Sequence, residues 1–150
     1  MRTRSMAATF AVAALFAGFG VSTASAAPPS EVAIQIMPTI PSPCNFSCGT
    51  WKASGAINDA GTYNGAHGAS APPDRPFLEF GPFREFFLLT SPSGSFTIET
   101  EERQTGIFVS HGIFQLEAGT GAYASATGHG DASSAPPFPI LFLTGVATTG

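Results

Sequence analysis

The chain is poor in charge, and above all in positive charge. Only 11% of its 150 residues are charged, and Lys and Arg together number six. Two of these cations, Arg2 and Arg4, precede residue 27, so residues 27–150 carry 4 − 10 = −6 charges. Nucleic-acid binding relies on clustered Lys and Arg that neutralise phosphates. We therefore expect no nucleic-acid partner, and no polybasic stretch attracts the chain to an anionic membrane.

Patterns typical of catalytic and metal sites are also missing. Residues 27–150 hold no Gly-x-Ser-x-Gly segment, which disfavours a serine hydrolase of that type. The three histidines, His67, His111 and His129, lie far apart and each adjoins a glycine. A zinc or iron site needs two or three ligands presented together. We expect exposed loop histidines, no metal and no cofactor.

Long apolar runs are confined to the N-terminus. A basic start, Met1–Ser5, precedes an apolar run over Met6–Val21, and small residues follow up to Ala26. This order is typical of a secretory signal peptide. The alternative, an uncleaved anchor, is disfavoured because the run is shorter than the roughly 20 residues of a comfortable span. The sequence predicts a signal peptide over 1–26, a secreted, extracellular protein, and no membrane span after cleavage.

Cysteine is scarce, with Cys44 and Cys48 as the only two. Export would place them where disulfides persist. A turn through Asn45–Ser47 brings cysteines at this spacing within bonding range. A redox pair usually has Cys-x-x-Cys spacing instead. We therefore predict a Cys44–Cys48 disulfide.

Residues 27–150 show no convincing helical period, whereas short stretches alternate between apolar and polar residues. The clearest alternation sets Phe96, Ile98 and Thr100 against Thr97, Glu99 and Glu101. Several short strands without helices indicate a β-sandwich or β-barrel. Further strands are expected over Glu31–Met37, Thr50–Ile57, 107–116 (as two strands, or one bent at His111-Gly112), Gly121–Asp131 and Phe138–Val146, with a turn at Ser91–Gly94.

The segment between these strands has a less regular pattern. Residues 62–76 are dominated by Gly, Ala, Ser and Pro, and we expect a strand remnant followed by a loop. Phe77–Thr90 is rich in Phe, and Gly81-Pro82 would interrupt a helix there. We expect a strand, a turn or bulge, and a second strand.

Charged residues give two candidate sites of unequal promise. Glu99, Glu101 and Glu102 could form the paired carboxylates of a glycosidase, but Glu99 and Glu101 fall on the polar face of their strand and are expected to be solvated. Glu79, Arg84 and Glu85 lie within the Phe-rich segment. If that segment lines a barrel interior, one of these three orients a small apolar ligand. The alternative is that they form the outward half of an alternating strand.

A glycine-rich motif carries a family resemblance. It comprises Gly119-Thr120-Gly121, Tyr123 and Gly128, together with similar stretches at Gly94–Glu99 and Trp51–Thr62. These segments resemble the allene oxide cyclase and dirigent superfamily, and more closely small secreted, mostly actinobacterial proteins of unassigned activity. The resemblance implies a small antiparallel β-barrel. Together with the N-terminal pattern, it divides the chain into the signal peptide (1–26), an N-terminal strand and disulfide loop (27–48), and the barrel domain (49–150).

The motif itself is interpreted as a marker of the fold. Gly119 and Gly121 permit a tight hairpin, Tyr123 covers the core, and Gly128 permits close contact between strands. A phosphate-binding loop would need a strand-to-helix context that the sequence lacks. Outside the motif no catalytic position of the superfamily can be matched, so the catalytic residues stay unknown.

Two hypotheses for function follow. The first is a non-enzymatic secreted barrel that binds a small hydrophobic ligand or a surface partner. The alternative is a cofactor-free cyclase- or dirigent-like enzyme that acts on an apolar intermediate. An enzyme needs an open lumen with an inward ionisable group, so a lumen filled by Phe and Leu would argue against it.

Overall fold

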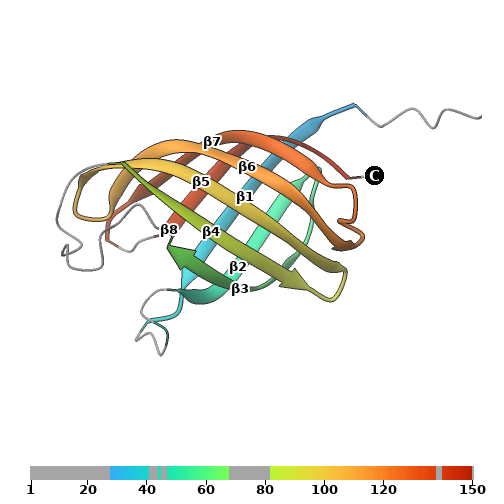
Figure 1. The fold of residues 1–150 in the computed structure, drawn as a ribbon, viewed down its shortest axis with the longest axis horizontal. Coiled ribbons are helices and arrows are strands. Elements are labelled where there is room, and N and C mark those ends of the chain that lie inside the picture. The colour runs from blue at the N-terminus through green and yellow to red at the C-terminus, as the bar shows by residue number, and fades with distance from the viewer. Residues whose placement is uncertain (1–27, 41–43, 45–46, 68–81, 138–139, 150) are drawn as a thin grey trace, which may run out of the picture.

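Eight antiparallel strands form one closed barrel in this computed structural model (Figure 1). The structure describes residues 28–40, 44, 47–67, 82–137 and 140–149. Each strand pairs with the next in the chain, and the first also pairs with the last. The strands are β1 (Ser30–Pro38), β2 (Cys48–Gly55), β3 (Ala60–His67), β4 (Pro82–Ser91), β5 (Gly94–Gly106), β6 (Val109–Gly121), β7 (Thr127–Ala135) and β8 (Ile140–Thr148). The expected all-β antiparallel barrel is confirmed, while residues 1–26 lie outside the described part.

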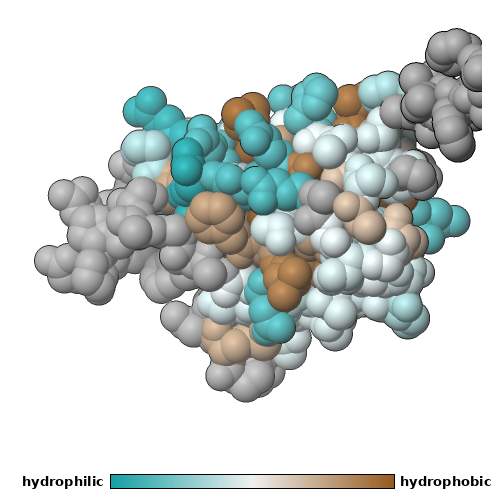
Figure 2. Space-filling model, turned by 45° about the vertical axis from the view of Figure 1, so that its right-hand side comes forward, coloured by the Kyte–Doolittle hydropathy of each residue, from teal (hydrophilic) through white to brown (hydrophobic). Residues whose placement is uncertain are grey.

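Alternation along the strands separates the core from the surface. Side chains at every second position point into the barrel and are buried, because successive residues of a strand face opposite sides of a sheet. On the outside, Figure 2 shows hydrophilic residues gathered in a band, with apolar residues scattered between them. The largest fully buried apolar side chains fill the interior: Trp51, Phe96, Phe114, Ile34, Ile36, Ile57, Leu89, Ile98 and Leu143. None of the described residues forms a helix able to cross a membrane.

Trp51 shows how tightly this interior is packed. Its indole N–H donates to the backbone oxygen of Thr90 at 3.2 Å, so a β2 side chain reaches over β3 to β4. Gly61 lies on β3 between the two, and a Cβ at that position would overlap the Thr90 oxygen and touch the indole nitrogen. A glycine is therefore required at this crossing. The Trp51 ring also packs edge-on against Phe96, with ring centroids 5.3 Å apart.

One end of the barrel, which we call the Asp59 end, is closed by three short connections at residues 56–59, 92–93 and 122–126. The Asp59 carboxylate accepts hydrogen bonds at Oδ2 from the hydroxyls of Ser91 and Tyr123, both at 2.6 Å, and at Oδ1 from the Ala60 amide at 2.8 Å. The bonds from Ser91 and Tyr123 are the main causes that lower the pKa of Asp59 from 3.8 to about 2. One carboxylate thus joins all three turns.

The glycine motif forms part of this end, as the sequence predicted. Gly121 adopts a φ of +60°, a left-handed conformation that glycine tolerates and most residues do not. The turn lets Tyr123 fold back over the core, where its ring lies edge-on to Phe96 at 4.8 Å between centroids. Tyr123 is only 5% exposed. The motif is therefore a structural element that seals the barrel.

Several predicted elements need correction. Residues 60–67 form a regular strand, β3, where a strand remnant was expected. Ile107 and Phe108, expected to belong to a strand, form the turn between β5 and β6 instead. Of the two alternatives for the residues that follow, the single strand is found, β6, in which Gly112 lies close to the Glu101 backbone. The chain turns at residues 122–126, so β7 begins only at Thr127. The expected break at Gly81-Pro82 falls at the edge of the described part: β4 begins at Pro82, and residues 68–81 lie outside it.

The proposed division at residue 48 does not separate two parts of the fold. β1 pairs with β2 on one side and with β8 on the other, and so closes the barrel. The predicted Cys44–Cys48 disulfide is confirmed, with 5.8 Å between the Cα atoms. It lies at the start of β2 and therefore belongs to the rim of the barrel.

Candidate functional site

Polar side chains enter the interior at the end opposite to Asp59. Along β5 the inward series Phe96, Ile98 continues with Thr100 and Glu102, which are 0% and 4% exposed. Ser110, at the start of β6, is equally buried. We call this region the Glu102 end. A buried carboxyl is unusual, because removing a charge from water is costly unless it is paired or neutralised.

Three hydroxyl and carboxyl groups form a hydrogen-bonded chain here. Glu102 Oε2 contacts Ser110 Oγ, and Ser110 Oγ lies 2.7 Å from Ser134 Oγ on β7. Ser134 Oγ in turn lies 3.1 Å from the backbone oxygen of Phe108. The chain links the interior carboxyl to the turn between β5 and β6.

The donors along this chain follow from what each atom can supply. The Phe108 oxygen can only accept, so Ser134 donates its one hydroxyl proton to it. Ser134 Oγ accepts from the Ser110 backbone amide at 3.1 Å. The Ser110 hydroxyl donates to Glu102 Oε2. The interior carboxyl is thus tied by hydrogen bonds to β6 and β7.

Opposing electrostatic effects set the pKa of Glu102. Burial is the largest cause that raises the pKa of Glu102, and the negative charge of Glu85 raises it further. The hydroxyls of Ser110 and Thr100 and the nearby His111 act in the opposite direction. The net pKa is raised above the ordinary value of 4.5. Glu102 thus holds a proton to higher pH than an exposed glutamate.

Two polar atoms of this cluster lack hydrogen-bond partners. Glu102 Oε1 and Thr100 Oγ1 are buried, and neither makes a hydrogen bond of good geometry in the described structure. Buried polar groups in proteins are nearly always hydrogen-bonded, so an orphaned pair calls for an explanation. One explanation is a loose contact between the two residues themselves, since the Thr100 hydroxyl acts on the pKa of Glu102. The other is a bound molecule that supplies a well-placed partner to each atom.

The interior next to Glu102 is lined by small residues. In the strand register Glu102 lies opposite Gly112, and Gly112 lies opposite Ala132 on β7. One step further towards the rim, Ser110 lies opposite Ser134. Toward the middle of the barrel Phe114 and Leu116 occupy the same face. Bulky side chains therefore fill the middle, while this end carries small polar and apolar groups on β6 and β7.

The residues predicted to orient a ligand fall on different sides of the wall. Glu85 shares the face of Phe87 and Leu89. Burial is the larger cause of the raised pKa values of Glu102 and Tyr63, and the charge of Glu85 raises both further. Arg84, one residue earlier, points outward and is 48% exposed. Glu79 lies outside the described residues. Of the three, Glu85 is the one that the structure places with the interior cluster.

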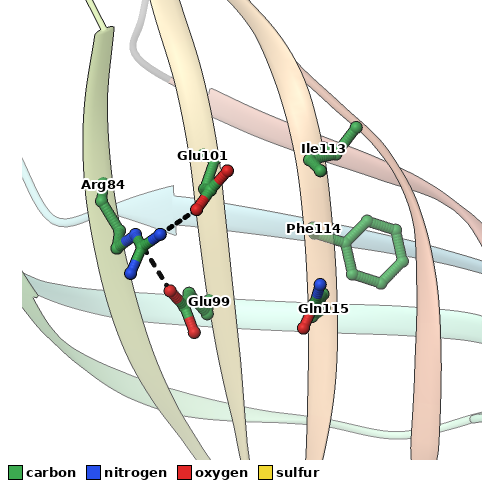
Figure 3. A pocket seen from close by; sticks show the side chains of 6 residues that line it. All are labelled: Arg84, Glu99, Glu101, Ile113, Phe114 and Gln115. Atoms are coloured by element: carbon green, nitrogen blue, oxygen red, sulfur yellow. Dashed lines mark hydrogen bonds and ion pairs between the residues drawn. The ribbon is translucent and has the colours of Figure 1, made fainter.

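Arg84 instead belongs to a surface site on β4, β5 and β6. Its guanidinium pairs with Glu99 at 3.1 Å and with Glu101, which confirms that both glutamates face outward (Figure 3). Beside the ion pairs lies a surface depression of about 260 Å³, reached also by Ile113 and Gln115. Exposed ion pairs of this kind contribute at most about 1 kcal/mol to stability. We interpret these two ion pairs as ordinary surface contacts and not as a ligand site.

The histidines lie on strands and not in loops. His111 is on β6 and His129 on β7, and both are exposed on the outer face. His67 ends β3. Within the described residues, no group of three His, Cys, Asp or Glu side chains is arranged to hold a metal.

Sequence reasoning missed the central residues of this site. It treated Glu102 as part of an acidic group and gave Ser110 and Ser134 no role. A signal for Glu102 was present, because the period of two that begins at Phe96 and Ile98 reaches Glu102 after two more steps. Compared with models of protein families, with curated proteins and with solved structures, the chain matches none of them.

Proposed function

We propose that this chain is a secreted, non-enzymatic barrel protein that binds a small hydrophobic molecule at the Glu102 end. One observation carries the proposal: Glu102 Oε1 and Thr100 Oγ1 are buried inside the barrel, and neither makes a hydrogen bond of good geometry. Ligand sites commonly combine apolar walls with a few polar groups that fix orientation. The disulfide is compatible with an oxidising, extracellular location.

The chemistry of the cluster indicates the kind of ligand. When protonated, Glu102 can donate a hydrogen bond from Oε1, and the Thr100 hydroxyl can donate and accept. Both groups suit a hydroxyl or carbonyl on an apolar body. A ligand carboxylate is disfavoured by the negative charge of Glu85, which acts on the same interior.

The alternative is a cofactor-free cyclase- or dirigent-like enzyme, in keeping with the family resemblance. The inward, ionisable Glu102 favours it, since such a group is the minimum that acid–base chemistry requires. Against it, Trp51, Phe96 and Phe114 occupy the middle of the barrel, where a large substrate would have to lie. This filling is the reason that binding is our first proposal.

A thermal-shift experiment on residues 27–150 tests the binding proposal. We expect 1-dodecanol, which has an apolar body and one hydroxyl, to raise Tm by about 5 °C at ten times its Kd. Dodecane, which lacks the polar group, should give a smaller shift. Glu102→Ala should abolish the difference between the two probes.

Glu117→Ala is the matched control, because Glu117 is an exposed glutamate on β6. It should behave as the unmodified protein. The absence of any shift with either probe, or an undiminished preference for dodecanol in Glu102→Ala, would overturn the proposal. Turnover of an apolar substrate that is lost in Glu102→Gln, with binding retained, would favour the enzyme.

A further inference from the structure

The turn between β5 and β6 presents two large apolar side chains to solvent. Ile107 is 61% exposed and Phe108 is 40% exposed, and Ile107 is the most exposed large apolar residue of the described part. Two-residue hairpin turns normally use Asn, Asp or Gly, because these residues tolerate the backbone conformations that such turns need. Ile and Phe do not tolerate these conformations well, so local turn preference does not account for their presence here.

Phe108 is also conformationally strained. Its φ of +56° lies in the left-handed region, which costs a residue with a Cβ about 1–2 kcal/mol. The strained turn is held in place: Ser134 donates to the Phe108 oxygen at 3.1 Å, and the Gln104 side chain donates to the Gly106 oxygen at 3.1 Å. Strain that the surroundings maintain commonly marks a functional element.

A cation lies behind this apolar tip. Arg103 faces His111 across the β5–β6 pair, and both are exposed. Arg103 precedes Gly106, the last residue of β5, by three strand steps, so it lies about 10 Å behind the end of the strand. The residues between Arg103 and Ile107 are the uncharged Gln104, Thr105 and Gly106.

This layering matches the order of groups at a lipid surface. Apolar side chains of a peripheral protein enter the acyl boundary by about 5–10 Å, and cations then lie level with the phosphates. A pocket on a protein partner would accept the apolar pair without requiring cations at that depth. The charge placement therefore favours a bilayer as the occupant.

We propose that Ile107 and Phe108 form a membrane-contacting tip, with Arg103 and His111 at the level of the lipid phosphates. The contact is weak and reversible, because two side chains bury little apolar area. It is led by the apolar tip and not by net charge, which is −6 for residues 27–150. The proposal does not depend on ligand binding at Glu102.

Co-sedimentation of residues 27–150 with lipid vesicles tests the tip. We expect binding to phosphatidylcholine vesicles, and stronger binding when phosphatidylglycerol is added. The double variant Ile107→Ser, Phe108→Asn should lose at least about tenfold in binding. Because Asn tolerates the left-handed region, Tm should change little.

Leu88→Ser is the matched control, since Leu88 is 47% exposed on the outer wall of β4. It should bind as well as the unmodified chain. In Ile107→Trp, brominated lipid should quench the new indole, whereas Trp51, buried in the core, stays unquenched. The proposal fails if vesicles of neither composition retain the protein. It also fails if the double variant binds equally well, or if light scattering shows that the tip instead joins two copies of the chain.

Discussion

The hydroxyl of Tyr123 donates a hydrogen bond to Oδ2 of Asp59 at 2.6 Å, across 64 residues of sequence. Ser91 donates to the same oxygen. The three residues stand in or beside the β6–β7, β2–β3 and β4–β5 turns, which a barrel of hairpins would otherwise leave independent. The half-buried Asp59 carboxylate therefore ties the three turns at this end of the barrel together.

Removal of the Tyr123 hydroxyl should weaken this end without disturbing the core. Tyr123→Phe keeps the ring against Phe96 and should lower the free energy of unfolding by about 1 kcal/mol. In the background of Asp59→Ala the same change should cost much less, because its partner is gone. Urea unfolding of the two single variants and the double variant measures this coupling. Equal costs in both backgrounds would contradict it.

Acid should unfold the protein partly through Asp59. Its pKa falls from 3.8 to about 2 on folding, so the stabilisation is complete above about pH 4 and is lost as the pH falls through about 2. Urea midpoints measured between pH 5 and pH 2 should drop more steeply for the unmodified protein than for Asp59→Asn, which cannot titrate. Parallel curves for the two proteins would show that Asp59 is not responsible.

Glu102 should give the opposite dependence on pH. Its pKa is raised on folding, chiefly by burial, so its contribution is fully present below about 4.5 and is lost as the pH rises through the folded value. We expect lower stability at pH 8 than at pH 5, and a flatter profile for Glu102→Gln. Glu117→Gln, which changes an exposed glutamate, should keep the slope of the unmodified protein.

Gly61 should tolerate no side chain. In Gly61→Ala the new Cβ would overlap the Thr90 oxygen, and overpacking of this kind costs about 1–3 kcal/mol. Because Trp51 is the single tryptophan, a change in its fluorescence should report the disturbed contact directly. Gly106→Ala is the control, since a Cβ there meets only ordinary contacts with Val109. An unchanged spectrum and unchanged Tm in Gly61→Ala would contradict the crossing.

The sequence alone determined the local features of this protein. Alternation predicted the inward face of β5 and the outward Glu99 and Glu101, because the direction of a side chain depends only on its position along the strand. The Ser91–Gly94 turn and the Cys44–Cys48 bond followed from turn chemistry and spacing. The glycine motif marked a hairpin closed by Tyr123.

The tertiary structure decided which distant residues meet. The closure of β1 on β8, the joining of Asp59 to Tyr123, and the chain from Glu102 to Ser134 all depend on pairing between strands far apart in sequence. The separation of Glu85 from Arg84 depended on fixing the phase of β4, which its unbroken run of Phe and Leu concealed. A period of two fixes which residues share a face, but only strand register brings those faces together into a site.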